Sequence, residues 1–323
     1  MPFVPPRFVP PSAPATEGKP AYVFSDRVKL AIDVALASGR PLLVSGSPGS
    51  GKTTLARAVA AGLGWRFLGR TITSRTRLED LEAEIDMLRR LADAQANDLD
   101  EDWTYLKPGV LWWAFDRPGA LRRGADGADT LKTKKAPPPA LADPSEGVKD
   151  SEHVVILLDE IDKADPDLPN DLLEPLDRKR FSLPLPDRPL VEAVDDVGVL
   201  LMMTTNGERE LPPAFLRRCI TLDLPDARPA GAEGQAEGEI TLEQIAAAHF
   251  GAASALAPLY GAVAQEVGAQ REDAARRGLR PPSTAEYVDT LRVLQQIPEL
   301  REKEKIWEEV KALLLQKTSR APA

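Results

Sequence analysis

The stretch that decides the fold is residues 41–61, which read PLLVSGSPGSGKTTLARAVAA. Residues 41–45 are short and apolar, as in a buried strand, and 54–61 are rich in alanine, as in a helix. Between them lies the pattern G-x-x-x-x-G-K-[ST], in which glycines let successive backbone N–H groups surround phosphate oxygens at a helix N-terminus. Strand, glycine-rich loop and helix form the context that this pattern requires, so the stretch predicts a nucleotide site.

Two side chains of this loop have specific expected roles. We expect Lys52 to reach the β- and γ-phosphates and Thr53 to offer its hydroxyl to Mg²⁺. The alternative is a glycine-rich turn with a solvated lysine. The candidate nucleotide-binding residues are Gly46, Ser47, Pro48, Gly49, Ser50, Gly51, Lys52, Thr53 and Thr54.

Two further apolar runs, 153–160 and 199–206, have the length and composition of strands buried on both faces of a parallel sheet. Both end in polar residues, and ligands bind at the carboxyl ends of strands in open α/β sheets. At the end of the first run, we expect Asp159 to hold Mg²⁺ and Glu160 to orient and deprotonate the attacking water. The alternative is an acidic helix N-cap after the strand.

The second run ends in Asn206, whose amide can bond both the attacking water and the γ-phosphate. Asn before Gly207 is also a common turn signal. Arg217 and Arg218 follow on a predicted short helix, and a guanidinium from a neighbouring subunit can neutralise charge on the γ-phosphate. A solvated or salt-bridged arginine pair is the alternative. We interpret the adjacent Cys219 as a small core residue.

Other segments predict further elements. Ser25 can cap a helix that Gly39 ends, and 77–96 repeats leucine or isoleucine every three or four positions, which predicts one packed helix. The prolines of 181–191 restrict that segment to an edge or a projecting hairpin. Capping boxes predict two helix starts in the last third of the chain, at Thr241 with Gln244 and at Ser283 with Glu286.

Composition shifts predict the domain organisation. We expect an α/β fold: a phosphate-loop domain with a parallel sheet flanked by helices, followed by a small all-helical domain, which the family resemblance given below implies is a lid. The predicted boundaries are a Pro-rich flexible arm at 1–20, the nucleotide-binding domain at 21–225 with a mobile insertion near 124–151, a linker at 226–240, the lid at 241–318 and a tail at 319–323.

The charge balance argues against a nucleic-acid partner. The chain carries 41 Lys and Arg against 50 Asp and Glu, a net charge of -9 that repels nucleic acid. Lys132, Lys134 and Lys135 are the exception and could supply a local patch. The single cysteine excludes an intrachain disulfide, and no apolar run reaches the ~18 residues of a membrane span. We therefore expect a cytoplasmic protein that binds no membrane.

The remaining chemistry-bearing residues have ordinary interpretations. His153 and His249 lack cysteine partners, so we interpret both as structural rather than as zinc ligands. Trp103, Trp112 and Trp113 lie among other apolar residues, so core packing is expected in preference to a base-stacking platform.

Together these motifs resemble the AAA+ ATPases, specifically the MoxR branch, over about 22–318. The resemblance rests on SGSPGSGKT, VVILLDEIDKADPDLPNDLLEPLDRKRFSLP, TTNGERELPPAFLRRC and RPPSTAEYVDTLR. It implies a ring, usually hexameric, with ATP between subunits. It maps Lys52 and Thr53 to Walker A, Asp159 and Glu160 to Walker B, Asn206 to sensor 1, and Arg218, with Arg217 beside it, to the trans-acting finger.

The resemblance also bears on the lid and on two insertions. Related lids often place an arginine in the first turn of the helix that begins near Ser283, where this chain has Thr284 and Ala285. Arg280, just upstream, is the candidate for this sensor 2 role. Two insertions typical of the branch, around 70–96 and 181–191, commonly face the pore or the substrate side of the ring.

The leading hypothesis is an Mg²⁺-dependent ATPase of the MoxR type that remodels or matures a protein partner. The resemblance implies that a von Willebrand factor A domain protein is the client or adaptor to look for. Two alternatives stay open: a nucleic-acid-linked AAA+ motor or defence-system ATPase, and a nucleotide-gated scaffold with little hydrolysis.

Overall fold

The structure, a computed structural model, describes residues 3–11, 21–125, 141–187, 189–233, 235, 238–297, 313 and 315. The Lys132, Lys134 and Lys135 patch and the tail expected at 319–323 lie outside the described residues. The chain forms two compact units, each discontinuous in sequence. Unit 1 consists of Met1–Arg7, Asp33–Leu43 and Leu63–Thr221, and unit 2 of Phe8–Ile32, Val44–Gly62 and Leu222–Ala323.

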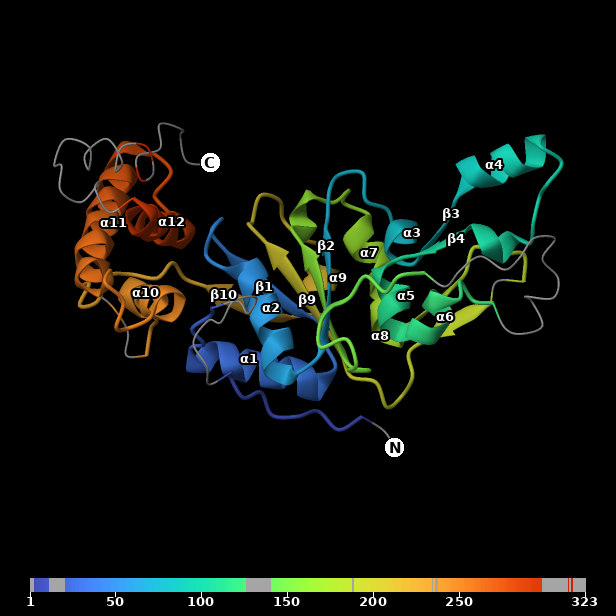
Figure 1. The fold of residues 1–323 in the computed structure, drawn as a ribbon, viewed down its shortest axis with the longest axis horizontal. Coiled ribbons are helices and arrows are strands. Elements are labelled where there is room, and N and C mark those ends of the chain that lie inside the picture. Colours follow the sequence, from blue (N-terminus) through green and yellow to red (C-terminus); the bar gives the residue numbers. More distant parts are fainter. Residues whose placement is uncertain are drawn as a thin grey trace. The chain divides into compact units, whose positions relative to one another are not determined.

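Helices and strands alternate in the first third of the chain, and the last three elements are all helices (Figure 1). The helices are α1 (Asp26–Ser38), α2 (Lys52–Leu63), α3 (Leu78–Leu81), α4 (Met87–Gln95), α5 (Val110–Phe115), α6 (Arg117–Leu121), α7 (Leu168–Asp171), α8 (Leu173–Arg178), α9 (Pro213–Leu216), α10 (Leu242–Phe250), α11 (Ala257–Arg277) and α12 (Thr284–Gln296). The strands are β1 (Leu42–Gly46), β2 (Arg66–Thr71), β3 (Ala83–Ile85), β4 (Leu106–Pro108), β5 (Glu146–Gly147), β6 (Val154–Asp159), β7 (Arg180–Ser182), β8 (Leu190–Glu192), β9 (Val199–Thr205) and β10 (Ile220–Leu224). Two 3₁₀ turns, η1 (Asp102–Tyr105) and η3 (Ile161–Lys163), complete the elements used below.

The main sheet has six strands in the order β10-β1-β9-β6-β2-β5. β6 pairs in parallel with both β2 and β9, whereas the two-residue β5 pairs antiparallel with β2. β5 lies within the expected insertion at 124–151. β1, β6 and β9 confirm the strands that the apolar runs predict, and the fold is the expected α/β sheet flanked by helices with a helical C-terminal region.

The core of unit 1 surrounds β6. Side chains from Val154 to Leu158 are at most 2% exposed, as expected for a strand covered on both faces. Trp103, Trp112 and Trp113 belong to the same buried cluster, which confirms that they pack in the core. Burial of this apolar face fixes the strand whose carboxyl end carries the two acidic residues.

The core of unit 2 lies among α10, α11 and α12. Tyr287 is fully buried there, and its hydroxyl donates a hydrogen bond to the Tyr260 carbonyl at 3.1 Å. Both predicted capping boxes are present, so Thr241 begins α10 and Ser283 begins α12. The α12 N-terminus is therefore held at a defined residue.

Two other predicted elements are confirmed. The Val28 N–H donates to Ser25 Oγ at 3.3 Å at the start of α1. Gly39, with a φ of 65°, follows the end of this helix. β7 and β8 form the antiparallel pair expected at 181–191, with Phe181 opposite Val191.

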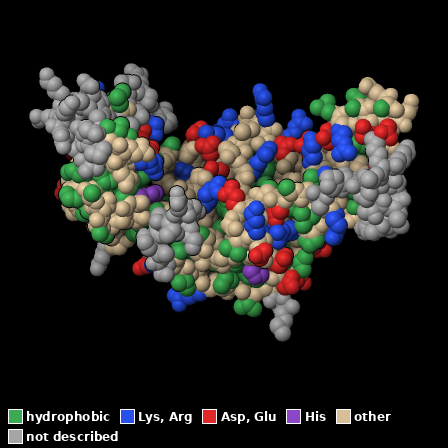
Figure 2. All heavy atoms as spheres, viewed as in Figure 1, with side chains coloured by type: hydrophobic (Ala, Val, Ile, Leu, Met, Phe, Trp, Pro, Cys, Tyr) green, Lys and Arg blue, Asp and Glu red, His purple; other side chains and the backbone are tan. Residues whose placement is uncertain are grey.

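The single helix predicted at 77–96 is wrong. The segment forms α3, then β3, then α4, because β3 pairs antiparallel with β4 and interrupts the helix. Leu81 is buried, but Leu88 is 83% exposed and Leu91 57% exposed, so the second half is not packed. Hydrophobic side chains are visible at the surface over α4 (Figure 2). Leucine spacing alone could not reveal the strand pairing that divides the segment.

Candidate functional site

In unit 2, the glycine-rich loop joins β1 to α2, and two of its glycines are required by close contacts. A Cβ on Gly46 would lie 2.8 Å from the Leu224 carbonyl oxygen. A Cβ on Gly49 would lie 2.6 Å from Ser283 Oγ, and Gly49 has a φ of 83°. The loop therefore runs close to β10 and to the start of α12. The Ala285 N–H donates to the Gly49 carbonyl at 3.1 Å, which joins the loop to the first turn of α12.

Lys52, the first residue of α2, points back into the loop. Its side chain is 7% exposed, and Nζ donates to the carbonyls of Gly46 at 2.7 Å and Ser47 at 2.9 Å. Ser50 Oγ is buried and has no hydrogen-bond partner among the described residues. A buried ammonium and an unsatisfied hydroxyl in one glycine-rich loop suit a phosphate group. The loop residues thus fit the triphosphate that the sequence predicts.

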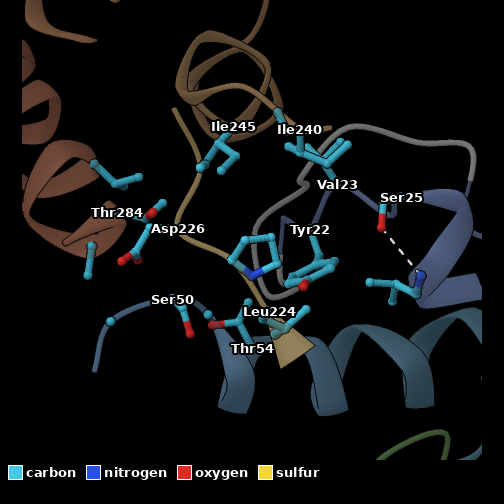
Figure 3. A pocket seen from close by; sticks show the side chains of 18 of the residues that line it. Tyr22, Val23, Ser25, Ser50, Thr54, Leu224, Asp226, Ile240, Ile245 and Thr284 are labelled. Carbon is cyan, nitrogen blue, oxygen red and sulfur yellow. Dashed lines mark hydrogen bonds between the residues drawn. The ribbon is translucent and has the colours of Figure 1, made fainter. Parts of the chain in front are cut away.

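A cavity of about 550 Å³ adjoins this loop within unit 2. Its walls come from the segment before α1, the loop and the start of α2, the end of β10, and α10 and α12 (Figure 3). The residues labelled in the figure are Tyr22, Val23, Ser25, Ser50, Thr54, Leu224, Asp226, Ile240, Ile245 and Thr284. A cavity of this size, mainly apolar with a few polar groups, is typical of small-molecule sites.

Tyr22 is a wall residue that the sequence analysis did not single out. Its ring lies 4.8 Å from the ring of Phe24, and a Cβ on Gly51 would be 3.6 Å from it. Burial raises the pKa of the Tyr22 phenol above its usual value, so the group stays neutral. No local motif marks this position, because the cavity brings together residues far apart in the chain.

His249 also lines the cavity, although the sequence suggested only a structural role. Burial, and to a smaller extent Arg292, lowers the pKa of His249 below its usual value. The imidazole is therefore neutral near pH 7. Asp226, another wall residue, accepts a hydrogen bond from Ser47 Oγ at 2.6 Å and so ties the loop to the end of β10.

In unit 1, the predicted acidic pair lies at the end of β6. Thr204 on β9 donates its hydroxyl to Asp159 Oδ1 at 2.5 Å and accepts the Glu160 N–H at 2.8 Å. Glu160 has a φ of 61°, which is uncommon for a non-glycine residue. Thr204 thus fixes the two acidic residues through one hydroxyl.

Asn206 lies beside Glu160, as the strand pattern suggests. Its Nδ2 donates to Glu160 Oε1 at 3.3 Å, and Lys163 Nζ lies 2.9 Å from Glu160 Oε2. This ion pair and the nearby acidic groups raise the pKa of Lys163. Both carboxylate oxygens of Glu160 therefore have a donor within unit 1.

Asp162 supports this arrangement and was missed by the sequence analysis. Its side chain is 3% exposed, and Oδ2 accepts the N–H groups of Asn206 at 3.1 Å and Glu208 at 3.0 Å. It holds the turn that carries Asn206. A further acidic residue two positions after Glu160 was the available signal, but its partners, Asn206 and Glu208, lie in the turn after β9.

Arg217 and Arg218 follow α9 instead of lying on it, because the helix ends at Leu216. Arg218 Nε lies 2.8 Å from Asp177 Oδ2, and the Arg218 side chain is 45% exposed. In the single chain Arg218 is therefore salt-bridged, as the alternative interpretation of the arginine pair states. Cys219 is buried, and burial raises the pKa of its thiol to about 11, as expected for a core residue.

Arg280 does not line the cavity. Its guanidinium lies 3.7 Å from Glu286 Oε1, and Glu286 is the residue that completes the α12 capping box. Its assignment as sensor 2 stays a prediction.

The other expected sites are unremarkable. His153 accepts the Gly198 N–H through Nδ1 at 2.9 Å, a structural contact. Over the part of the chain that the structure describes, no three His, Cys, Asp or Glu side chains gather as a metal-binding group. Within the same residues, no helix is both long and apolar enough to cross a bilayer.

Comparison with known proteins decides the family. The family model described as the AAA domain (dynein-related subfamily) matches residues 41–219, from the start of β1 to the end of the arginine-bearing turn. The chain belongs to this family. The match includes the glycine-rich loop, the acidic end of β6 and Asn206, so these three features lie within the AAA domain.

More specific relatives match less of the chain. The aerobic cobaltochelatase subunit CobS of a Sinorhizobium species is 33% identical over 102 residues, which are 32% of this chain and 28% of the relative. Two variants of RuvB from Thermotoga maritima are 14% and 16% identical, each with a TM-score of 0.43 over 89% of this chain and 67% or 68% of the other. At this level of similarity the RuvB structures say nothing about activity.

Proposed function

We propose that this AAA-domain protein is an Mg²⁺-dependent ATPase of the MoxR type, which uses hydrolysis in a ring of subunits to remodel or mature a protein partner. The observation that carries the proposal is the buried Lys52 ammonium, held by loop carbonyls beside a cavity large enough for a nucleotide. Burying a cation costs free energy unless a partner compensates its charge, and a bound triphosphate would be such a partner.

In unit 2, the loop residues bind the triphosphate and the adjoining cavity holds the base and sugar. Lys52 exchanges its bonds to loop carbonyls for bonds to phosphate oxygens. Tyr22, neutral and partly buried, offers an aromatic face to the base. The apolar side chains of Leu224 and Ile245 exclude water from the same cavity.

Thr53 and Asp159 are the residues that would hold Mg²⁺, which supplies charge neutralisation at the phosphates when bound. Glu160 acts as the base that takes a proton from the attacking water. Asn206 positions that water and the γ-phosphate through its amide. The hydrogen bond between Asn206 and Glu160 supports this pairing of roles, because it keeps the amide and the carboxylate together.

Hydrolysis requires a second copy of the chain. AAA domains commonly form rings, and we propose that Arg218, with Arg217 beside it, acts on the nucleotide of the neighbouring subunit. The 45% exposure of Arg218 supports this role, because a guanidinium that serves another chain must be accessible. Asp177 holds the side chain until the neighbour is present.

The MoxR resemblance points to a von Willebrand factor A domain protein as that partner. Both the partner and the number of subunits in the ring are part of the proposal.

The test is the rate of ATP hydrolysis with Mg²⁺ for the wild type, Lys52→Ala and Glu160→Gln. We expect turnover that rises as subunits assemble, weakened nucleotide binding in the first variant, and binding without turnover in the second. Equal rates in the wild type and Glu160→Gln would contradict the enzymatic role and favour a nucleotide-gated scaffold. A rate that rises on addition of DNA would favour the nucleic-acid motor.

A further inference from the structure

Arg40 lies between α1 and β1 in unit 1 and contacts the turn that carries the two arginines. Its Nε donates to the Arg218 carbonyl at 3.1 Å, and its Nη2 donates to the Cys219 carbonyl at 3.0 Å. Nη2 also donates to the Arg217 carbonyl. One guanidinium therefore binds three consecutive carbonyls of the same turn.

These carbonyls need such a partner because of where they lie. The last carbonyls of a helix have no partner within the helix, and 217–219 directly follow the short α9. The N–H groups of Arg217, Arg218 and Cys219 already bond carbonyls of 213–216, so the turn is closed on itself. The guanidinium of Arg40 supplies the donors for the carbonyls of 217–219.

The turn is also fixed at its far end. The Ile220 N–H donates to the Pro41 carbonyl at 2.8 Å, so the residue after Arg40 holds the residue after Cys219. Cys219 is 6% exposed, whereas the side chains of Arg217 and Arg218 are exposed. The backbone is thus held from within unit 1 while the two arginine side chains are presented to solvent.

We infer that Arg40 is a positioning residue that fixes the backbone of 217–219 so that Arg218 is presented in the geometry needed by a neighbouring subunit. The inference rests on the proposed function. Arg40 acts through this backbone and not on the nucleotide. Its planar fork of N–H donors suits three neighbouring acceptors, and a lysine ammonium cannot bind them in the same arrangement.

The expected effect is on turnover and not on nucleotide binding. A displacement of about 1 Å in a catalytic group can cost about 100-fold in rate, so we expect Arg40→Met to lower kcat by about 10- to 100-fold. The affinity for ATP should stay unchanged, because the guanidinium of Arg40 bonds the turn at 217–219 and not the nucleotide-binding loop. Arg40→Lys should give an intermediate rate.

Mixing variants separates this role from a general loss of structure. Arg40→Met retains a complete nucleotide site, and Glu160→Gln retains a complete arginine turn. In mixed rings, some interfaces combine the intact part of each, so we expect the mixture to hydrolyse ATP faster than the mean of the two variants alone. Arg40→Met mixed with Arg218→Ala should show no gain, because both are defective on the same side.

Controls make each result decisive. Arg277→Met removes another exposed arginine, which pairs with Asp273 on α11, and should leave kcat unchanged. If thermal unfolding shows that Arg40→Met does not fold, Arg40→Lys takes its place in every mixture, with the same expected gain.

Two results would overturn the inference. A wild-type kcat in Arg40→Met is one, and the absence of any gain with Glu160→Gln is the other. Arg218→Ala mixed with Glu160→Gln tells the two proposals apart. If that pair gains activity and the Arg40 pair does not, only the role of Arg40 fails; if neither gains, the proposed function of Arg218 between subunits fails as well.

Discussion

The two cations assigned to the same reaction lie in opposite environments. Lys52 in unit 2 is 7% exposed and bound to carbonyls of its own loop, whereas the Arg218 side chain in unit 1 is 45% exposed and paired with a single carboxylate. A buried cation can only serve a ligand that enters its own chain. An exposed one can serve a ligand held elsewhere. The comparison supports the proposed roles, nucleotide binding for Lys52 and action on a neighbouring chain for Arg218.

The largest expected effect is that of Arg218→Ala. Loss of an arginine that stabilises the transition state in trans lowers kcat by about 10³-fold, while the dissociation constant for ATP stays unchanged. Turnover and equilibrium binding, measured on the same preparation, check both parts. Weakened ATP binding without a change in kcat would break the comparison, because Arg218 would then behave like Lys52.

The next effect is that of Lys52→Ala on affinity. Hydrogen bonds to charged groups contribute about 1.5–3 kcal/mol, so the dissociation constant for ATP should rise by about 10- to 100-fold. Titration calorimetry measures it. Lys29→Ala is the control, since Lys29 is a lysine of unit 2 whose ammonium pairs with Asp26. Unchanged affinity in Lys52→Ala would refute the binding role.

A smaller effect, on stability, tests how tightly the loop is enclosed. An alanine at Gly49 meets Ser283 at 2.6 Å, so Gly49→Ala should lower the free energy of unfolding by about 1–3 kcal/mol. Gly64→Ala is the matched control, because Gly64 also has a positive φ but nothing lies within 4 Å of its Cβ position. Urea unfolding of both variants separates the cost of the contact with Ser283 from the cost of placing alanine at a positive φ. Equal losses would mean that the contact with Ser283 adds nothing.

The smallest effect concerns the partner of Arg218. Pairs this exposed contribute at most about 1 kcal/mol, so Asp177→Asn should change both stability and kcat only slightly. Asp273→Asn provides the comparison, as Asp273 forms similar exposed pairs on α11. A loss of turnover as large as that of Arg218→Ala would show that Asp177 orients the arginine and does not merely hold it.

The sequence predicted what depends on short segments. The strand, loop and helix around Lys52 follow from a pattern of neighbouring residues, and the cap at Ser283 follows from a spacing of three. The sequence also predicted that Asp159, Glu160 and Asn206 end strands, and the structure brings Glu160 and Asn206 into contact. Their catalytic roles stay predictions.

What escaped prediction depends on pairings between distant residues. The helix expected over 77–96 is divided by pairing with β4, and nothing in its leucine spacing reports that strand. The cavity brings Tyr22 and Ile245 together, and Arg40 bonds the carbonyl of Cys219, which lies 179 positions later in the chain. Such contacts arise from tertiary packing, which local patterns do not encode.

The hydrogen bond between the Ala285 N–H and the Gly49 carbonyl consists of main-chain atoms alone. Every amino acid except proline supplies that N–H, so the bond places almost no demand on the identity of residue 285. Residue 285 can therefore change its side chain while the loop stays joined to α12. Among substitutions at residue 285, only proline removes this hydrogen bond, so only proline would reveal the junction in a mutagenesis screen.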